Sequence, residues 1–206
     1  MKTVVLAVAS LFTILATTQF ATYAQTGDKL NPGDATPGTD IQMRNASGST
    51  MTLKAAAKEN GLLVMFSCNT CPFVVKNQPI TTKVIDYATE HHIGMVIINS
   101  NDAQRVGEDS YHSMIKYAVA QHYTVPYLLD EGSKMADMFG ASHTPEVFLF
   151  NSQGKLVYKG AMNDNPSDPA SYKKMYVEDA MDAMIAGKEV NPKTTKSIGC
   201  SIKRKA

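Results

Sequence analysis

The sequence predicts an α/β fold: a central mixed β-sheet with helices on both faces and an N-terminal β-hairpin extension. Two mainly apolar runs, at residues 62–66 and 95–99, are typical of strands covered on both faces. Segments with helical spacing of apolar residues separate the predicted strands. A polar turn at 151–154 joins two further apolar runs into an antiparallel hairpin. Together these patterns indicate one mixed sheet with crossover helices.

The first 24 residues differ from the rest of the chain. Lys2 precedes an apolar run at 4–16, and the small residues Thr22 and Ala24 resemble a cleavage site. Polar residues interrupt the run before it reaches the roughly 20 apolar residues that a membrane span needs. We therefore expect a signal peptide at 1–24, export to the periplasm or the exterior, and no membrane span in the mature form.

Composition suits a single domain: 44% of the 206 residues are apolar and 19% are charged. Removal of Lys2 with the signal peptide takes the formal charge from +1 to 0. A net charge near zero gives no indication of nucleic-acid binding. We expect an extended lead-in at 25–38, one domain at 39–190, and a C-terminal tail at 191–206. The basic residues 203–205 are expected to be a solvated terminus.

In the first half of the domain, weak alternation around 45–48 predicts a hairpin within 40–54. The strand at 62–66 follows. Apolar residues at helical spacing then predict a helix from 72 to 90, kinked at Pro79. The strand at 95–99 and a polar loop at 100–108 complete this half.

In the second half, Asp109 is the predicted cap of a helix, and Ser133 that of a shorter helix ended by Gly140. A short strand at 126–129 lies between them. Strands at 146–150 and 156–158 form the hairpin, and a last helix is expected from Asp168 to 187. The helix after Asp109 has an apolar stripe that consists of Tyr111, Met114, Ile115, Ala118 and Val119.

The chemistry of the chain centres on Cys68 and Cys71, which directly follow the strand at 62–66. If a helix opens at Pro72, both sulfurs lie at its first turn, where free amide groups and the helix dipole favour a thiolate. Such a pair is typical of a redox dithiol. A structural zinc site would need a second pair of ligands at matching spacing, and Cys200 is the only other cysteine.

A second motif, His143-Thr144-Pro145, precedes the strand at 146–150. With Cys68-Asn69-Thr70-Cys71, it makes the chain resemble the thioredoxin-fold superfamily, in which a Thr-Pro with a cis proline faces the active-site dithiol. The resemblance is closest to the peroxiredoxin-like (AhpC/TSA-type) redoxins that carry a Cys-x-x-Cys, and it spans roughly residues 35–203. Segments 99–102, 108–110, 126–130, 158–160 and 199–203 also look like the segments of that group. A thioredoxin-like redoxin fold is the implied architecture.

The leading hypothesis is a thiol–disulfide oxidoreductase without a cofactor. In it Cys68, expected to be the more exposed thiol, attacks a protein or small-molecule disulfide, and Cys71 resolves the mixed disulfide. The Thr70 hydroxyl would hold the thiolate, and the Thr144 backbone beside Pro145 would pair with an extended substrate peptide. An external thiol donor or acceptor would complete the cycle.

Two alternatives remain open. A thiol peroxidase would use Cys68 against peroxide, but peroxiredoxins carry a threonine three residues before the attacking cysteine, and here Met65 precedes Cys68 at that spacing. A non-enzymatic redoxin would hold Cu(I) through Cys68, Cys71 and His143. Cys200 is a candidate third thiol of the relay or a free tail thiol.

Overall fold

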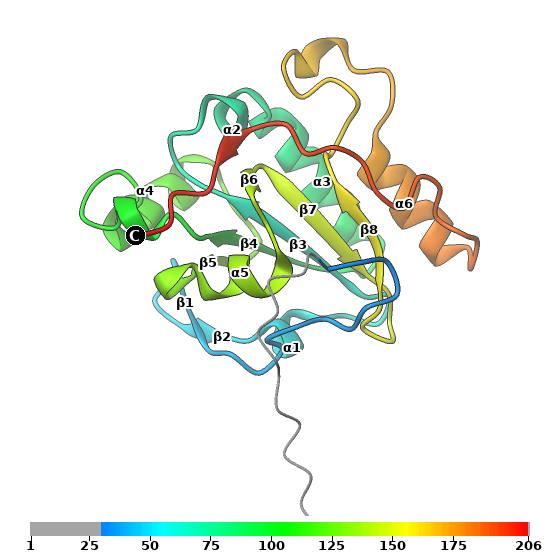
Figure 1. Cartoon of the computed structure of the whole chain (residues 1–206), viewed down its shortest axis with the longest axis horizontal. Coiled ribbons are helices and arrows are strands. Elements are labelled where there is room, and N and C mark those ends of the chain that lie inside the picture. Colours follow the sequence, from blue (N-terminus) through cyan, green and yellow to red (C-terminus); the bar gives the residue numbers. More distant parts are fainter. Residues whose placement is uncertain (1–29, 206) are drawn as a thin grey trace, which may run out of the picture.

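A central β-sheet organises the molecule, which we describe for residues 30–205 of a computed structural model (Figure 1). The predicted signal peptide and residues 25–29 lie outside this range. The strands are β1 (Met43–Asn45), β2 (Thr50–Met51), β3 (Leu62–Ser67), β4 (Gly94–Asn99), β5 (Tyr127–Leu129), β6 (His143–Thr144), β7 (Glu146–Phe150), β8 (Leu156–Gly160) and β9 (Cys200–Ser201). The helices are α1 (Leu53–Ala56), α2 (Pro72–Lys76), α3 (Gln78–Glu90), α4 (Tyr111–Ala120), α5 (Lys134–Phe139) and α6 (Tyr176–Ile185). Short 3₁₀ turns are η1 (Asp102–Gln104), η2 (Glu131–Ser133) and η3 (Pro169–Ser171).

Seven strands form one mixed sheet in the order β2-β1-β5-β4-β3-β7-β8. Strands β3, β4 and β5 run parallel, while β7 pairs with β3 in the antiparallel direction. The register places Ser67 opposite Asn99, so the carboxyl ends of β3 and β4 meet at one edge of the sheet. The predicted fold class, including the N-terminal hairpin of β1 and β2, is confirmed.

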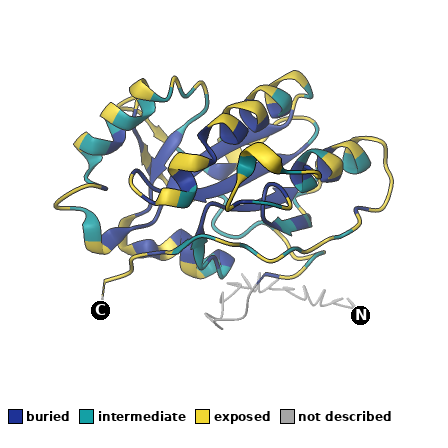
Figure 2. Ribbon diagram, turned by 90° about the horizontal axis from the view of Figure 1, so that it is seen from above, coloured by how far each residue is buried: buried dark blue, intermediate teal, exposed yellow. Residues whose placement is uncertain are grey.

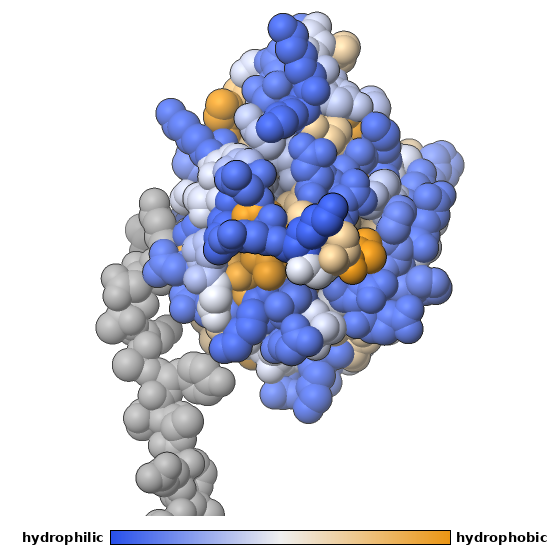
Figure 3. All heavy atoms as spheres, turned by 90° about the vertical axis from the view of Figure 1, so that its right-hand side faces the viewer, coloured by the Kyte–Doolittle hydropathy of each residue, from blue (hydrophilic) through white to orange (hydrophobic). Residues whose placement is uncertain are grey.

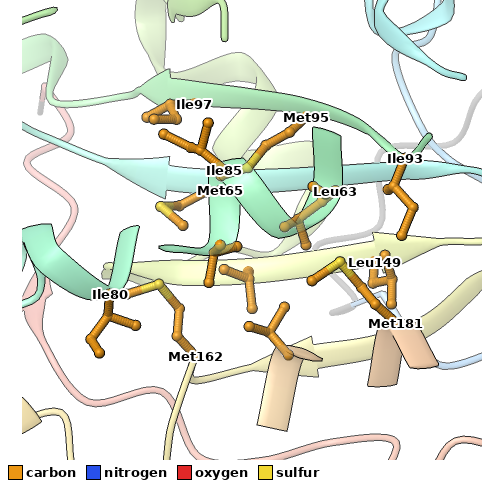
Figure 4. Close-up of a cluster of buried hydrophobic side chains, with 14 of the residues drawn as sticks. Leu63, Met65, Ile80, Ile85, Ile93, Met95, Ile97, Leu149, Met162 and Met181 are labelled. Atoms are coloured by element: carbon orange, nitrogen blue, oxygen red, sulfur yellow. The ribbon is translucent and has the colours of Figure 1, made fainter. Parts of the chain in front are cut away.

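Helices cover both faces of the sheet, and the strands between them are buried (Figure 2). Alternation along β3 divides its side chains between two clusters: Leu63 and Met65 pack toward α3 and α6, whereas Val64 and Phe66 pack toward α1 and α5. Figure 4 shows the first cluster, where side chains of β3, β4 and β7 meet those of α3 and α6. These two layers fix the end of β3, from which the cysteine motif follows.

The predicted helix from 72 to 90 is divided at Asn77 rather than kinked at Pro79. The side-chain amide of Asn77 donates to the carbonyls of Phe73 and Pro166, both at 2.8 Å. Pro79 lies in the first turn of α3, where its missing N–H costs no helical hydrogen bond. The short helix α2 is therefore a separate element that begins directly after Cys71.

Two side chains that were predicted to cap helices make no capping bond, because other hydrogen bonds use them, although Ser133 does occupy the N-cap position of α5. Ser110, not Asp109, caps α4 through a 3.2 Å bond from the Ser113 amide, and Asp109 is fully buried. The Ser133 hydroxyl donates to the Ser100 carbonyl, and the Asp130 carboxylate accepts from the first amides of α5 instead. The end of that helix at Gly140, with φ of 63°, is confirmed.

The last predicted helix begins later than expected, at Tyr176 instead of Asp168. Residues 169–171 form only the turn η3, and the Asp164 carboxylate accepts from the Lys173 amide, which keeps this segment out of the helix. One residue of the predicted apolar stripe of α4 is also misplaced, because Val119 is 71% exposed. Among residues 30–205, no helix combines the length and apolarity that a membrane crossing requires.

The two ends of the described chain run along the outer side of β8. The Gly33 amide donates to Leu156 O at 2.8 Å, and the Thr195 amide donates to Lys159 O at 3.0 Å. The basic residues 203–205 are exposed, as expected, and Arg204 also pairs with Asp137 at 2.7 Å. Figure 3 shows that the face on the side of α6 is largely hydrophilic, with only small hydrophobic patches.

Candidate active site

The two cysteines of the motif lie where β3 ends and α2 begins. Cys68 follows the last residue of β3, and Cys71 is the residue that precedes α2, with Pro72 as its first helical residue. The mainly apolar sequence of β3 forces a buried strand, and the proline allows the helix to start at once. As predicted, both thiols are therefore held near the N-terminal end of a helix.

Strand β6 brings Thr144 against both sulfurs. The Thr144 hydroxyl lies 3.4 Å from Cys68 Sγ, and the Cys71 thiol donates to the Thr144 carbonyl oxygen at 3.3 Å. The bond between Thr144 and Pro145 is cis, as the motif predicted. Thr144 thus contacts Cys68 and Cys71, although it lies about 75 positions from them in the sequence.

The expectation that Cys68 is the more exposed thiol is wrong. Cys68 is 2% exposed and Cys71 is 5% exposed, since Cys68 continues directly from a strand covered on both faces. Hydrogen bonding with the Cys71 side chain, followed by burial, raises the pKa of Cys68. Hydrogen bonding with the Cys68 side chain, aided by Cys200 and the Val74 amide, lowers the pKa of Cys71 to about 4. The two thiols therefore titrate together: loss of one proton from the pair is favoured, and loss of the second is opposed.

The remaining predicted residues are spread around this pair. Thr70 and Pro72 are exposed, and the hydroxyl that lies beside a thiol is that of Thr144. His143 hydrogen-bonds Ser142 Oγ through Nδ1 at 2.8 Å, and its neighbour Thr144 faces the cysteines, since successive residues of a strand point to opposite sides. Within residues 30–205, no three His, Cys, Asp or Glu side chains are arranged to hold a metal ion. Cys68, Cys71 and His143, the ligands of the copper alternative, do not form such a group.

A buried polar network, whose role no sequence pattern indicated, supports the loop between the two cysteines. Asp109 Oδ1 accepts from the Asn69 amide at 2.9 Å and from Asn99 Nδ2 at 2.7 Å, while its other oxygen accepts from Asn101 Nδ2 at 2.9 Å. The Tyr127 hydroxyl donates to Asn69 Oδ1 at 2.8 Å. The network ties the loop to the ends of β4 and β5. The segments 99–102 and 108–110 were the available signal, but the resemblance gave their residues no role.

Cys200 joins the same site from the other end of the chain. Strand β9 pairs with β6 in the antiparallel direction, with Cys200 opposite Thr144, and Cys200 packs against the cluster of Cys68, Cys71 and Val74. Figure 1 shows this red segment passing beside α2. The edge of β6 that was expected to receive a substrate peptide is therefore occupied by the chain's own tail. All three cysteines are free thiols, and Cys200 is the least buried.

Comparisons with known proteins identify the family of the chain. The model of the Redoxin family matches residues 25–176, which is most of the chain. The chain belongs to the Redoxin family. The comparison with curated proteins finds no match. The predicted family resemblance is confirmed at this level.

Solved structures similar to this redoxin include one with 33% sequence identity and others with 14% sequence identity. An uncharacterized conserved protein from Geobacillus kaustophilus is 33% identical, with a TM-score of 0.77, and the match covers 85% of this chain and 93% of that one. At 14% identity, a putative thiol:disulfide interchange protein DsbE from Chlorobium tepidum has a TM-score of 0.57, with 77% and 98% covered. Peroxidoxin BcpB from Mycobacterium tuberculosis, also 14% identical, has a TM-score of 0.55, with 76% and 95% covered. The last two share the thioredoxin-like fold with this redoxin.

Proposed function

We propose that this redoxin is an exported thiol–disulfide oxidoreductase that exchanges disulfides through Cys68 and Cys71. The observation that carries the proposal is the convergence of both sulfurs on Thr144, next to cis Pro145 and at the start of α2. A dithiol at this position combines a stabilised thiolate with a second sulfur close enough to displace a partner. The names of the fold neighbours, which include a disulfide interchange protein, support the same class of reaction.

We propose the reverse of the order of attack expected from the sequence, with Cys71 as the attacking thiol and Cys68 as the resolving thiol. Hydrogen bonding with the Cys68 side chain lowers the pKa of Cys71, so we take Cys71 as the attacking thiolate once it has lost the proton that it donates to the Thr144 carbonyl oxygen. It attacks one sulfur of an external disulfide, forms a mixed disulfide, and releases the other sulfur as a thiolate. Cys68 then loses its proton and attacks the Cys71 sulfur, which forms the Cys68–Cys71 disulfide and releases the second thiolate. One disulfide is consumed and one is formed, and the reverse sequence hands the disulfide to an external dithiol.

Reduction of insulin disulfides, with dithiothreitol as the electron source, tests the exchange. We expect Cys71→Ser to abolish activity, and Cys68→Ser to accumulate a mixed disulfide on Cys71 that non-reducing electrophoresis detects. Ser201→Ala, an exposed change nearby, is the matched control and should react as the unmodified protein does. Equal activity of Cys71→Ser and the control would refute the exchange mechanism.

The reduction potential of the Cys68–Cys71 pair decides whether the protein oxidises or reduces its partners. A stabilised Cys71 thiolate stabilises the reduced form, so the potential should lie above about −270 mV, the value of thioredoxin, and toward the about −120 mV of a strong oxidant. Equilibration with glutathione buffers measures it. A value at or below that of thioredoxin would identify a reductant.

Export is a separate part of the proposal, supported by Lys2, the apolar run at 4–16 and the small residues before position 25. Mass spectrometry of the protein purified from the periplasm of an expressing bacterium should give an N-terminus at Gln25. Recovery of the full-length chain from the cytoplasm alone would contradict export.

A thiol peroxidase is the second candidate function. The observation in its favour is the Thr144 hydroxyl, 3.4 Å from Cys68 Sγ, which supplies a hydroxyl that the sequence motif lacks. The burial of Cys68 and its raised pKa weigh against rapid attack on peroxide. Peroxide consumption far above that of a free thiol, lost in Cys68→Ser, would favour this candidate over disulfide exchange.

A further inference from the structure

The Cys68–Cys71 disulfide would be difficult for an external thiol to reach. Both sulfurs belong to residues that are at most 5% exposed. Strand β9 lies over them on the side of β6, with Cys200 packed against the pair. An external dithiol must attack one sulfur of a disulfide directly, so burial of both sulfurs slows this step, as it also slows the attack of Cys71 on an external disulfide.

Cys200 occupies the position from which the buried disulfide can be moved outward. It lies opposite Thr144, whose carbonyl oxygen is 3.3 Å from Cys71 Sγ, and it belongs to the same packed cluster as Cys71. It is also the least buried of the three cysteines. Of the two cysteines that pack with Cys71, Cys68 is therefore the more deeply buried and Cys200 the less buried.

We propose that Cys200 is a third exchange thiol. It attacks Cys71 in the Cys68–Cys71 disulfide, and the resulting Cys71–Cys200 disulfide is the one that an external dithiol reduces. The proposal rests on the function proposed above, because it supplies the outward half of the same exchange. It assigns a role to the tail segment that occupies the edge of β6.

The steps balance in sulfur, protons and electrons. The Cys200 thiol gives up its proton, and its thiolate attacks the Cys71 sulfur of the Cys68–Cys71 disulfide. The Cys71–Cys200 disulfide forms, and Cys68 leaves as a thiolate that takes a proton. A thiolate of the external dithiol attacks the Cys200 sulfur, so that Cys71 leaves as a thiolate. The second thiol of the partner then closes the partner's own disulfide and releases Cys200.

The charges of the site suit this order. In the fully reduced protein, burial and the neighbouring Cys71 raise the pKa of Cys200 to about 11, so Cys200 stays protonated there. Once Cys71 is in a disulfide, its negative charge is gone and that contribution disappears. In the last exchange the leaving group is Cys71, whose thiolate is the most stable of the three, and thiols of lower pKa leave faster.

The backbone holds Cys200 in place for this role. A Cβ at Gly199 would lie 2.1 Å from the Thr144 carbonyl oxygen, so only glycine permits this close approach of β9. On the far side of Cys200, the Ile202 amide donates to Ser142 O at 3.0 Å and the Lys203 amide donates to Asn101 Oδ1 at 2.9 Å. The tail is fixed on both sides of the sulfur.

Disulfide mapping is the direct test. The Cys68→Ala protein is reduced, treated with oxidised glutathione, alkylated and digested without reductant. We expect a Cys71–Cys200 disulfide as the main product. Glutathione retained on Cys71 with Cys200 alkylated would overturn the proposal. Circular dichroism of the variant confirms its fold, and the mapping needs no physiological substrate.

A kinetic test uses protein in which Cys68 and Cys71 are both unchanged. Preoxidised protein is mixed with dithiothreitol, and free thiols are counted over time. We expect Cys200→Ser to slow reduction about tenfold, since the buried disulfide must then be attacked directly, and Ser201→Ala to leave the rate unchanged. Equal rates for Cys200→Ser and Ser201→Ala would overturn the role of Cys200. If insulin is not reduced but the Cys71–Cys200 disulfide forms, the proposed function fails while this inference stands.

Discussion

The carbonyl oxygen of Thr144 lies 3.3 Å from the sulfur of Cys71, and its hydroxyl lies 3.4 Å from the sulfur of Cys68. One residue therefore contacts both thiols through two different groups. The backbone contact depends on the position of β6, whereas the hydroxyl contact depends on the side chain alone. Substitutions of Thr144 can therefore remove the hydroxyl contact and keep the backbone contact.

Replacing Thr144 by valine removes the hydroxyl and keeps the shape. The hydroxyl lowers the pKa of Cys68, so its loss should raise that pKa further and slow the attack of Cys68 on the mixed disulfide. A neutral hydrogen bond contributes about 0.5–1.5 kcal/mol, which corresponds to a rate decrease of about 2- to 10-fold. Stopped-flow measurement of mixed-disulfide resolution checks this. Thr144→Ser keeps the hydroxyl and should resolve at nearly the original rate, and equal rates in all three proteins would exclude a role for it.

Asp109→Asn tests the network beneath the cysteine loop. Its buried carboxylate accepts three hydrogen bonds, and an amide group would turn a donor toward Asn99 or Asn101. We expect a loss of about 1–3 kcal/mol in the free energy of unfolding, measured by urea denaturation. Glu108→Gln, the exposed neighbour, should change stability by less than about 0.5 kcal/mol. A stable Asp109→Asn variant would show that the loop holds without the network.

The charge on Cys71 should give the reduced protein an unusual pH dependence. Because the pKa of Cys71 is lowered to about 4, its thiolate persists from neutral pH down to that value and is lost as the pH falls through it. An ordinary cysteine, with a pKa of about 8.5, would already be protonated at neutral pH. Ultraviolet absorbance of the thiolate measures the titration. Cys68→Ala removes the largest cause of the shift, so the midpoint should rise; an unchanged midpoint would contradict this origin.

Gly199→Ala should displace β9 without a change to the seven-stranded sheet. The added Cβ would meet the Thr144 backbone at 2.1 Å, which only a shift of the tail relieves. Overpacking of this kind costs about 1–3 kcal/mol. We expect faster alkylation of Cys200 and less Cys71–Cys200 disulfide on oxidation. Gly107→Ala is the control, since its Cβ would meet only Gln104 O at 3.9 Å; equal alkylation rates in the two variants would mean that β9 tolerates the methyl group.

The strands could be predicted from sequence because the buried runs of β3 and β4 have no other stable placement than a covered sheet. Helix ends were less predictable. Asp109 has the chemistry of a cap, yet its carboxylate is used by Asn69, 40 residues away, and no local pattern reveals such a partner. The start of α6 was missed for a related reason, since Asp164 holds the segment after Asp168 in a turn.

The candidate site was predictable in part. The spacing of Cys68 and Cys71 and the resemblance that includes Thr144-Pro145 indicated which residues meet. The relative exposure of the two thiols was predicted wrongly, because Cys68 continues directly from the buried strand β3. The place of Cys200 beside Cys71 depends on pairing between β6 and β9, and two strands of two residues each leave almost no sequence pattern.

The outer side of β8 shows why both ends of the described chain matter for more than the site. Residues 33–36 pair with its first half, and residues 193–195 pair with its second half. An uncovered border strand offers a row of amide and carbonyl groups on which another molecule can add a strand. Here residues 33–36 and 193–195 take that place, so removal of either segment would turn a closed border into a template for aggregation.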